Sequence, residues 1–229
     1  MSAGRRVREK LASLSPDVLR DRDEWFKLLE EFGFNDENPH ELPESMLSHP
    51  GFGLRIWQYP NQFAPYMAWL ASNALRIDSY LEIGVRHGGT FVTHVETLRR
   101  LNPSFRSAVA VDLIRQSELL RDYEYRQDNS QSAVFKDWIG GQFFDLVFID
   151  GDHSYGGVAN DAALTINRSN IQVFHDIASD ACPDVRKFWR DYQETHGDTH
   201  DFVEFVDQYD SVNGSFLGIG VAFRREWFE

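Results

Sequence analysis

The stretch Tyr80-Leu81-Glu82-Ile83-Gly84-Val85-Arg86-His87-Gly88-Gly89-Thr90 decides the fold of this chain, because an apolar strand runs into a glycine-rich turn that opens a helix. Gly84 lets the backbone turn where the strand ends, and Gly88 and Gly89 let a ligand approach the main chain. The first turn of the helix presents backbone N–H groups that have no partner within the helix. The stretch therefore predicts a ligand-binding turn, and a glycine-rich turn that binds nothing is the alternative.

The spacing of these glycines disfavours two common nucleotides. NAD is bound by G-x-G-x-x-G, whereas this chain has Gly84-x-x-x-Gly88-Gly89, and a P-loop for ATP would place a lysine before Thr90. A ligand with an ammonium and a carboxylate at one end would use Glu82, the glycine backbone and the Thr90 hydroxyl together. The acid-x-Gly-x-x-x-Gly pattern resembles the first motif of class I S-adenosylmethionine-dependent methyltransferases.

Composition sets broad limits on the class of protein. With 229 residues and 42% apolar content, the chain is long enough for one sizeable α/β core. A net charge of −13 disfavours nucleic acid as a partner, and no apolar run is long enough for a membrane span. The single cysteine, Cys182, excludes an internal disulfide and fits a reducing compartment. We therefore expect a soluble cytoplasmic protein without a signal peptide.

The first 78 residues differ in pattern from the rest of the chain. Apolar spacing predicts a helix from Ser15 to Phe34, and prolines predict an irregular segment from Asn35 to Pro65 of the kind that forms lids. A helix over 62–75 leads into the first strand. We expect residues 1–78 to form a helical cap and lid that packs on the core, and residues 79–229 to form the methyltransferase-like domain, both within one structural unit.

Strands and helices alternate after residue 78. We predict strands at 79–83, 107–112, around 125, 143–149 and 171–174, and helices at 90–101, 129–138, 155–166 and 184–192. Two further strand-like runs, 202–206 and 216–223, are joined through Asn213-Gly214, which is a hairpin signal. The pattern predicts a Rossmann-like, doubly wound α/β fold with a mostly parallel seven-stranded sheet and an antiparallel C-terminal hairpin strand.

Polar residues follow the second and third strands, where ligands of such sheets bind. Asp112 lies about 30 residues after Glu82, where a carboxylate can accept both hydroxyls of a ribose. The third strand is followed by Asp128, Ser130 and Gln131, whose side chains could contact an adenine edge. Capping of the next helix is the alternative for each of these positions.

The fourth and fifth strands end in acids and histidines. Asp150 and His153 follow one strand, and His175 and Asp176 follow the next. Adjacent strands lie about 4.8 Å apart, so Asp150 and Asp176, with His175, could share a divalent cation, and His153 could act as a general base near neutral pH. The alternative is that these residues cap helices or bond within their turns.

The span from Tyr80 to Asp176 resembles the metal-dependent O-methyltransferase branch of this family, which includes catechol and macrocin O-methyltransferases. The resemblance implies contacts to the methionine end from Glu82, Gly84, Gly88 and Thr90, to the ribose from Asp112, to adenine from Ser130 and Gln131, and to a metal from Asp150 and Asp176. His153 occupies the place of the base. Specificity loops of the family correspond to residues 51–65 and 178–183, and relatives have two acids or Asp-Asn where this chain has His175-Asp176.

These patterns predict an S-adenosylmethionine-dependent methyltransferase that uses a divalent cation, with magnesium expected. The predicted acceptor is a small molecule with a hydroxyl group, such as a sugar, a polyol or a catechol-like compound. The sequence leaves open an assembly of identical copies. One alternative is a metal-dependent hydrolase that uses the Asp150, His153, His175 and Asp176 cluster to activate water, and another is a non-catalytic cofactor-binding partner.

Overall fold

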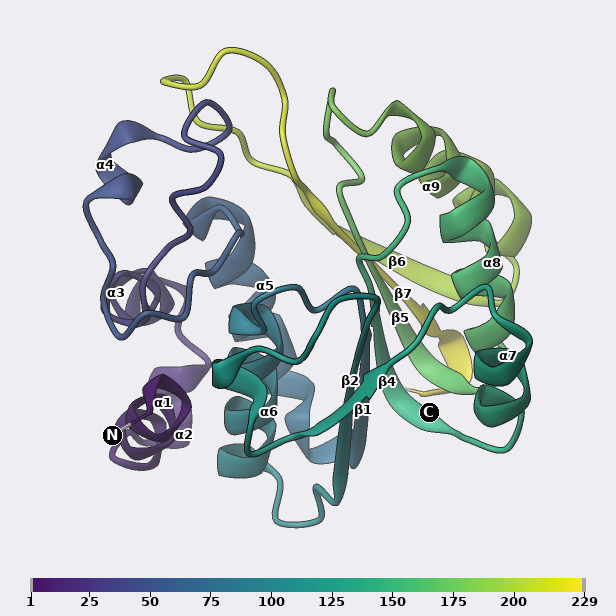
Figure 1. Ribbon diagram of the computed structural model, residues 1–229, viewed down its shortest axis with the longest axis horizontal. Helices are drawn as coiled ribbons and strands as arrows, with labels where there is room; N and C mark the ends of the chain where they lie inside the picture. Colours follow the sequence, from purple (N-terminus) through teal and green to yellow (C-terminus); the bar gives the residue numbers. More distant parts are fainter. Residues whose placement is uncertain (1, 228–229) are drawn as a thin grey trace.

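The computed structural model describes residues 2–227, which contain one seven-stranded sheet with helices on both faces (Figure 1). The strands are β1 (Ser79–Ile83), β2 (Ser107–Asp112), β3 (Glu124–Gln127), β4 (Phe144–Ile149), β5 (Ser169–His175), β6 (His200–Phe205) and β7 (Ile219–Arg224). Their order is β3-β2-β1-β4-β5-β7-β6, and β7 runs antiparallel to both of its neighbours while the first five strands are parallel. The predicted fold class is confirmed.

Helices cover the sheet in two layers. The α-helices are α1 (Ala3–Ala12), α2 (Pro16–Leu19), α3 (Arg22–Phe32), α4 (Glu44–Leu47), α5 (Pro60–Asn73), α6 (Gly89–Leu101), α7 (Ala133–Gly140), α8 (Tyr155–Thr165) and α9 (Pro183–His196), with 3-10 turns η1 (Ala74–Arg76), η2 (Glu118–Leu120) and η3 (Arg225–Trp227). Figure 1 shows α5 and α6 on one face of the sheet and α7, α8 and α9 on the other. No helix within residues 2–227 combines the length and apolar character needed to cross a membrane.

Alternate residues along each strand belong to two separate apolar layers. Tyr80 and Leu146 lie in the layer shared with α5 and α6, whereas Leu81 and Val147 lie in the layer shared with α7, α8 and α9. This alternation follows from the two-residue period of a strand, whose successive side chains point to opposite faces. Because both faces are covered, β1 and β4 are buried almost throughout, and the apolar run that ends β4 made that strand visible in the sequence.

The N-terminal helices pack against the helical layer formed by α5 and α6. Helix α1, which the sequence pattern did not predict, contacts α6, and α3 contacts α5. The predicted single helix from Ser15 to Phe34 is divided, because the Asp21 carboxylate accepts the backbone N–H of Asp23 at 2.7 Å and thereby starts a new helix. The division of the chain at residue 78 stays a prediction.

The connection between β6 and β7 is long rather than a tight hairpin turn. Residues 206–218 separate the two strands, and Asn213 and Gly214 lie within this loop. Gln62 holds the loop, because its amide donates to the Asp207 carbonyl at 2.8 Å and its carbonyl accepts the Gly218 N–H at 2.9 Å. The predicted Asn-Gly turn is therefore wrong, although β6 and β7 do pair antiparallel.

Gly84 is the glycine on which the turn after β1 depends. Its φ is 90°, and a Cβ atom there would lie 2.0 Å from the Asp150 carbonyl oxygen. We expect Gly84→Ala to lower the free energy of unfolding by about 3 kcal/mol or more, because both the backbone and the neighbouring strand end must shift. Urea unfolding measures this change.

Gly140→Ala is the matched control, since a Cβ atom at Gly140 meets nothing within 4 Å at the end of α7. It should leave stability unchanged or raise it by about 0.5 kcal/mol. Equal stability of the two variants would contradict the steric role of Gly84.

Candidate functional site

A cavity of about 860 Å³ opens at the carboxyl ends of β1, β2, β4 and β5. All predicted cofactor, metal and base residues line it: Glu82, Gly84, Gly88, Thr90, Asp112, Asp128, Ser130, Gln131, Asp150, His153, His175 and Asp176. The structure thus brings together residues from the carboxyl ends of β1 to β5 and from the loops that follow them. Their individual roles remain predictions.

The glycines of the turn after β1 are required by contacts within the protein. In addition to the contact of Gly84 described above, a Cβ atom on Gly88 would lie 2.5 Å from the Leu120 side chain, and one on Gly89 would lie 2.3 Å from the Leu54 carbonyl oxygen. The sequence pattern had indicated close approach of a ligand at Gly88 and Gly89. Packing of the protein's own segments already accounts for both.

Glu82 lies at the floor of the cavity and is buried. Burial raises the pKa of Glu82 well above its usual range, although the Tyr80 hydroxyl that donates to its carboxylate acts in the opposite direction. The nearby Asp150 carboxylate raises the pKa further. A positively charged ligand group beside Glu82 would reverse this effect, because it would stabilise the ionised carboxylate.

His94 packs against Tyr80, the residue whose hydroxyl donates to Glu82. It is fully buried, its Nδ1 lies 2.8 Å from the Thr90 carbonyl oxygen, and its Nε2 lies 2.8 Å from the Tyr66 hydroxyl. Burial lowers the pKa of His94 to about 3, so the ring is neutral. It stacks on the ring of Tyr80 at 5.1 Å between centroids. The cluster of aromatic rings therefore fixes the β1 side of the cavity.

Asp112 joins the loops that follow β1 and β2. Its carboxylate accepts the backbone N–H of Arg86 at 2.6 Å and that of Ile114 at 3.2 Å. A carboxylate has about four lone-pair sites, so these two bonds leave room for a ligand. The structure thus supports a turn-stabilising role for Asp112 and leaves its oxygens able to accept hydroxyl groups as well.

Asp128 has more of its capacity used within the protein. Its carboxylate accepts from the Ser132 hydroxyl at 3.0 Å, the Asn129 N–H at 2.9 Å and the Arg126 Nε at 3.0 Å. Burial would raise the pKa of Asp128, but Ser132 and Arg126 lower it. The next helix begins after Ser132 rather than at Asn129 as predicted, because the Ser132 hydroxyl caps it.

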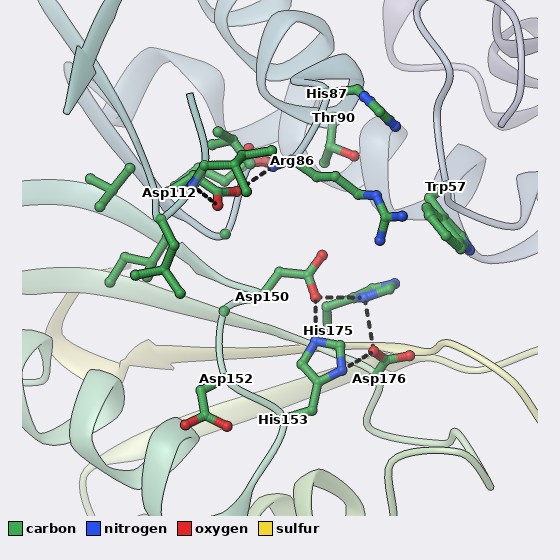
Figure 2. A pocket seen from close by; sticks show the side chains of 18 of the residues that line it. Trp57, Arg86, His87, Thr90, Asp112, Asp150, Asp152, His153, His175 and Asp176 are labelled. Atoms are coloured by element: carbon green, nitrogen blue, oxygen red, sulfur yellow. Dashed lines mark hydrogen bonds and ion pairs between the residues drawn. The ribbon is translucent and has the colours of Figure 1, made fainter. Parts of the chain in front are cut away.

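Two carboxylates and two imidazoles alternate around the ends of β4 and β5, and we call this group the acid–histidine ring (Figure 2). Asp150 Oδ1 lies 3.0 Å from His175 Nδ1 and 3.2 Å from His153 Nε2. Asp176 Oδ2 lies 3.4 Å from His153 Nδ1 and 3.5 Å from His175 Nδ1. Each acid therefore faces both histidines.

The charges of the acid–histidine ring balance one another. Burial would raise the pKa of Asp150, but the facing His175 and His153 hold it well below its usual range. Hydrogen bonds that the protonated His153 ring makes to Asp150 and Cys182 raise the pKa of His153 to about 11. Burial would lower the pKa of His175, yet Asp150 and Asp176 raise it to about 10. In this arrangement both ring nitrogens of His153 are protonated at neutral pH. His153 can act as a base only after another positive charge takes the place of one of these protons.

The donor atoms of the acid–histidine ring fit a divalent cation. Asp150, His175 and Asp176 each offer a ligand atom, and these atoms lie within 4.8 Å of one another. His175 is buried, and its Nε2 atom has no hydrogen-bond partner among residues 2–227. A cation could take the place of the two imidazole protons, because carboxylate and imidazole are common ligands of divalent metals.

Cys182 is a neighbour of this ring that the sequence pattern did not reveal. Its Sγ atom lies 3.2 Å from His153 Nδ1, and Cys182, His153 and Asp176 form a second set of ligand atoms within 4.8 Å. The two residues are 29 positions apart, and only the meeting of the β4 and β5 loops unites them. The predicted specificity segment 178–183 therefore does reach the cavity.

Backbone strain is concentrated at the cavity. Among residues 2–227, four non-glycine residues have positive φ, and all four line it: Arg55 (56°), Arg86 (45°), Asp176 (62°) and Leu217 (59°). Such conformations persist only where the surrounding structure enforces them, and they gather at functional sites. No sequence pattern marks these positions, because none of the four is a glycine.

Comparisons with known proteins point to one family. Residues 81–177 match the family described as "Methyltransferase domain". No curated protein matches the chain. The family match confirms the predicted resemblance to methyltransferases and does not favour the metal-dependent hydrolase or the non-catalytic partner.

Three solved structures show how far the fold is shared. Cofactor-bound Rv0187 from MTB has a TM-score of 0.54 at 16% identity, covering 82% of this chain and 85% of that one. The O-methyltransferase TomG from Streptomyces achromogenes in complex with SAM has a TM-score of 0.50 at 16% identity, covering 89% and 98%. The MycE methyltransferase of mycinamycin biosynthesis in complex with Mg and SAH has a TM-score of 0.50 at 14% identity, covering 69% and 47%. At these identities the likeness is one of fold.

The titration of the ring histidines tests its charge balance. We expect the imidazole ¹⁵N signals of His153 and His175 to remain those of protonated rings at pH 8 in the metal-free protein, and to titrate near pH 10 to 11. In Asp150→Asn both pKa values should fall toward the usual 6.5, because a facing negative charge is lost.

His196 serves as the internal reference for that titration. It lies outside the cavity, burial lowers its pKa, and Asp150→Asn should leave it unchanged. Titration of His153 near pH 6.5 in the wild-type protein would disprove the charge balance.

Proposed function

We propose that this chain, which carries a methyltransferase domain over residues 81–177, transfers the methyl group of S-adenosylmethionine to a hydroxyl oxygen of a small molecule such as a sugar, a polyol or a catechol-like compound. The observation that carries the proposal is the single cavity in which the glycine turn, Asp112 and the acid–histidine ring meet. Nucleotide ligands of doubly wound sheets bind at this edge. The cofactor complexes among the structures with the same fold support this choice of donor.

The donor would lie along the β1 and β2 side of the cavity. We assign Glu82, Gly84, Gly88 and Thr90 to its methionine end, Asp112 to the ribose, and Asp128, Ser130 and Gln131 to the adenine side. The donor's ammonium group suits the buried Glu82, and the remaining lone pairs of Asp112 suit two ribose hydroxyls. Of the three residues on the adenine side, Asp128 would mainly hold its own loop, because its carboxylate already accepts from three donors within the protein.

A divalent cation would be held by Asp150, His175 and Asp176. When bound, it would supply positive charge that favours the ionised form of the acceptor hydroxyl. The two carboxylates suit magnesium, the ion expected from the sequence, and the magnesium in the MycE complex is consistent with that choice. The shared fold alone does not identify the ion, so the donor set of this chain carries the proposal.

His153 would accept the acceptor's proton. Its side chain is 43% exposed at the cavity wall, and Asp150 orients it through the 3.2 Å contact to Nε2. The chain's main contribution would be alignment, because the sulfonium is already an activated methyl donor. Holding the acceptor oxygen, the methyl carbon and the sulfur in line is what the fixed loops of this cavity can provide.

Calorimetry with S-adenosylhomocysteine tests the donor directly. We expect saturable binding to the wild-type protein and weaker binding to Asp112→Ala, because the ribose would lose a bidentate acceptor. Absence of binding, with and without magnesium, would contradict the proposed function.

Asp150→Asn should abolish cation-dependent methyl transfer while leaving the affinity for S-adenosylhomocysteine within a few-fold, because only the acid–histidine ring loses a charge. Turnover with and without a chelator measures this effect. Asp201→Asn is the control, since Asp201 pairs with Arg225 outside the cavity. Full activity of the wild-type protein after chelation would argue against the cation.

His153→Ala should lower kcat by about 10²-fold or more and change KM for the acceptor much less, because general-base catalysis acts in the transition state. Steady-state kinetics separates the two constants. An equal loss of turnover and acceptor affinity would reassign His153 to positioning, and His40→Ala, a change at an exposed side chain, should alter neither.

A further inference from the structure

Two arginines with strained backbones meet at the mouth of the cavity. Arg55 comes from the segment before α5 and has a φ of 56°, and Arg86 comes from the glycine turn and has a φ of 45°. Both side chains line the cavity and are about half exposed. Non-glycine residues seldom adopt this conformation, so the surrounding structure must enforce it at both positions.

Glu37 holds the two guanidinium groups together. Its Oε1 atom accepts from Arg55 Nη2 at 2.6 Å, its Oε2 atom accepts from Arg86 Nη2 at 2.8 Å, and Oε1 also lies 3.0 Å from His87 Nε2. Burial would raise the pKa of Glu37, but Arg86 and His87 lower it to about 2. Arg55, Arg86 and His87 line the cavity, whereas Glu37 does not. The carboxylate therefore holds the arginines from the side away from the cavity.

Most of the donor groups of these arginines are left for another partner. A guanidinium has five N–H groups, yet within residues 2–227 Arg86 uses only Nη2 as a side-chain donor, and Arg55 uses only Nη2, toward Glu37 and Asp36. The Arg86 guanidinium carbon lies 4.2 Å from the centroid of the Trp57 ring. Stacking on an aromatic face covers the plane of the guanidinium and leaves its edge for hydrogen bonds.

The position of Arg86 directs that edge into the cavity. Figure 2 shows its side chain extending between Thr90 and the acid–histidine ring, beside Trp57. The opposite wall carries the carboxylates of Asp150 and Asp176. One cavity therefore has two carboxylates on one wall and two arginines, paired with Glu37 and Asp36, at its mouth, in a chain whose net charge is −13. The guanidinium N–H groups that Glu37 and Asp36 leave unused suit an anion, and they do not suit the sulfonium of the donor.

We propose that Arg55 and Arg86 form an anion-binding site for a carboxylate or phosphate group, and that this group belongs to the acceptor. The acceptor would then be an acidic hydroxyl compound, such as a sugar acid, a sugar phosphate or a hydroxylated aromatic acid. The assignment of this anionic group to the acceptor rests on the proposed function. The methionine carboxylate of the donor has the same chemistry and lies on the side of Gly84 to Thr90, so the test distinguishes the two sources.

Titration with inorganic phosphate tests the anion site itself. The indole N–H signal of Trp57, identified by its loss in Trp57→Phe, should shift saturably with phosphate in the wild-type protein in the absence of S-adenosylhomocysteine. The apparent affinity should fall about ten-fold in Arg86→Gln and in Arg55→Gln, and less in Arg86→Lys. Arg5→Gln, which removes an exposed arginine that is likewise paired with a glutamate, should change nothing. No saturable shift in the wild-type protein, or equal affinity in Arg86→Gln, would overturn the site.

Calorimetry identifies which anion the site takes. If it binds the acceptor, Arg86→Gln should leave the affinity for S-adenosylhomocysteine unchanged, and phosphate should not compete with it. An approximately ten-fold loss for S-adenosylhomocysteine, with no loss for 5′-methylthioadenosine, which lacks the carboxylate, would overturn the acceptor assignment in favour of the donor. Failure of S-adenosylhomocysteine to bind the wild-type protein would instead contradict the proposed function, and the phosphate titration without it would still decide the anion site.

Discussion

The close contact between the turn after β1 and the end of β4 is the constraint on which the site depends. Gly84 packs directly against the Asp150 carbonyl, and the Asp150 N–H donates to the Ile83 carbonyl at 2.8 Å. The Gly84 N–H in turn donates to the Val111 carbonyl at 2.8 Å, which ties in β2. Because this spot admits no side chain, the glycine turn, the end of β2 and the acid–histidine ring border one cavity instead of three separate surfaces.

The wall and the mouth of that cavity carry different sets of paired charges. Asp150 and Asp176 balance His153 and His175 at one wall, so a bound cation or a change in protonation would alter the charge there. At the mouth, Glu37 holds cationic groups in place. A cation at one wall would meet carboxylates, and an anionic acceptor at the mouth would meet unused guanidinium N–H groups, so local complementarity would orient the ligands.

Local sequence patterns predicted the sheet and the residues that line the cavity for a clear physical reason. Parallel strands covered on both faces are apolar runs with polar ends, and those ends share one edge, so residues from Glu82 to Asp176 could be assigned to one cavity from the sequence alone. Three features could not be predicted from the sequence. They are the charge state of the acid–histidine ring, the approach of Cys182 to His153, and the Glu37 bridge between two arginines. They depend on contacts between distant loops and on backbone angles that leave no mark in the local sequence.

A crystal structure of the protein with bound S-adenosylhomocysteine would show directly where the donor lies relative to both walls. We expect the ribose hydroxyls on the Asp112 carboxylate and the sulfur atom facing the acid–histidine ring. A ligand bound outside this cavity, or bound inside it with its sulfur turned away from Asp150 and His153, would rule out the shared site for donor and acceptor.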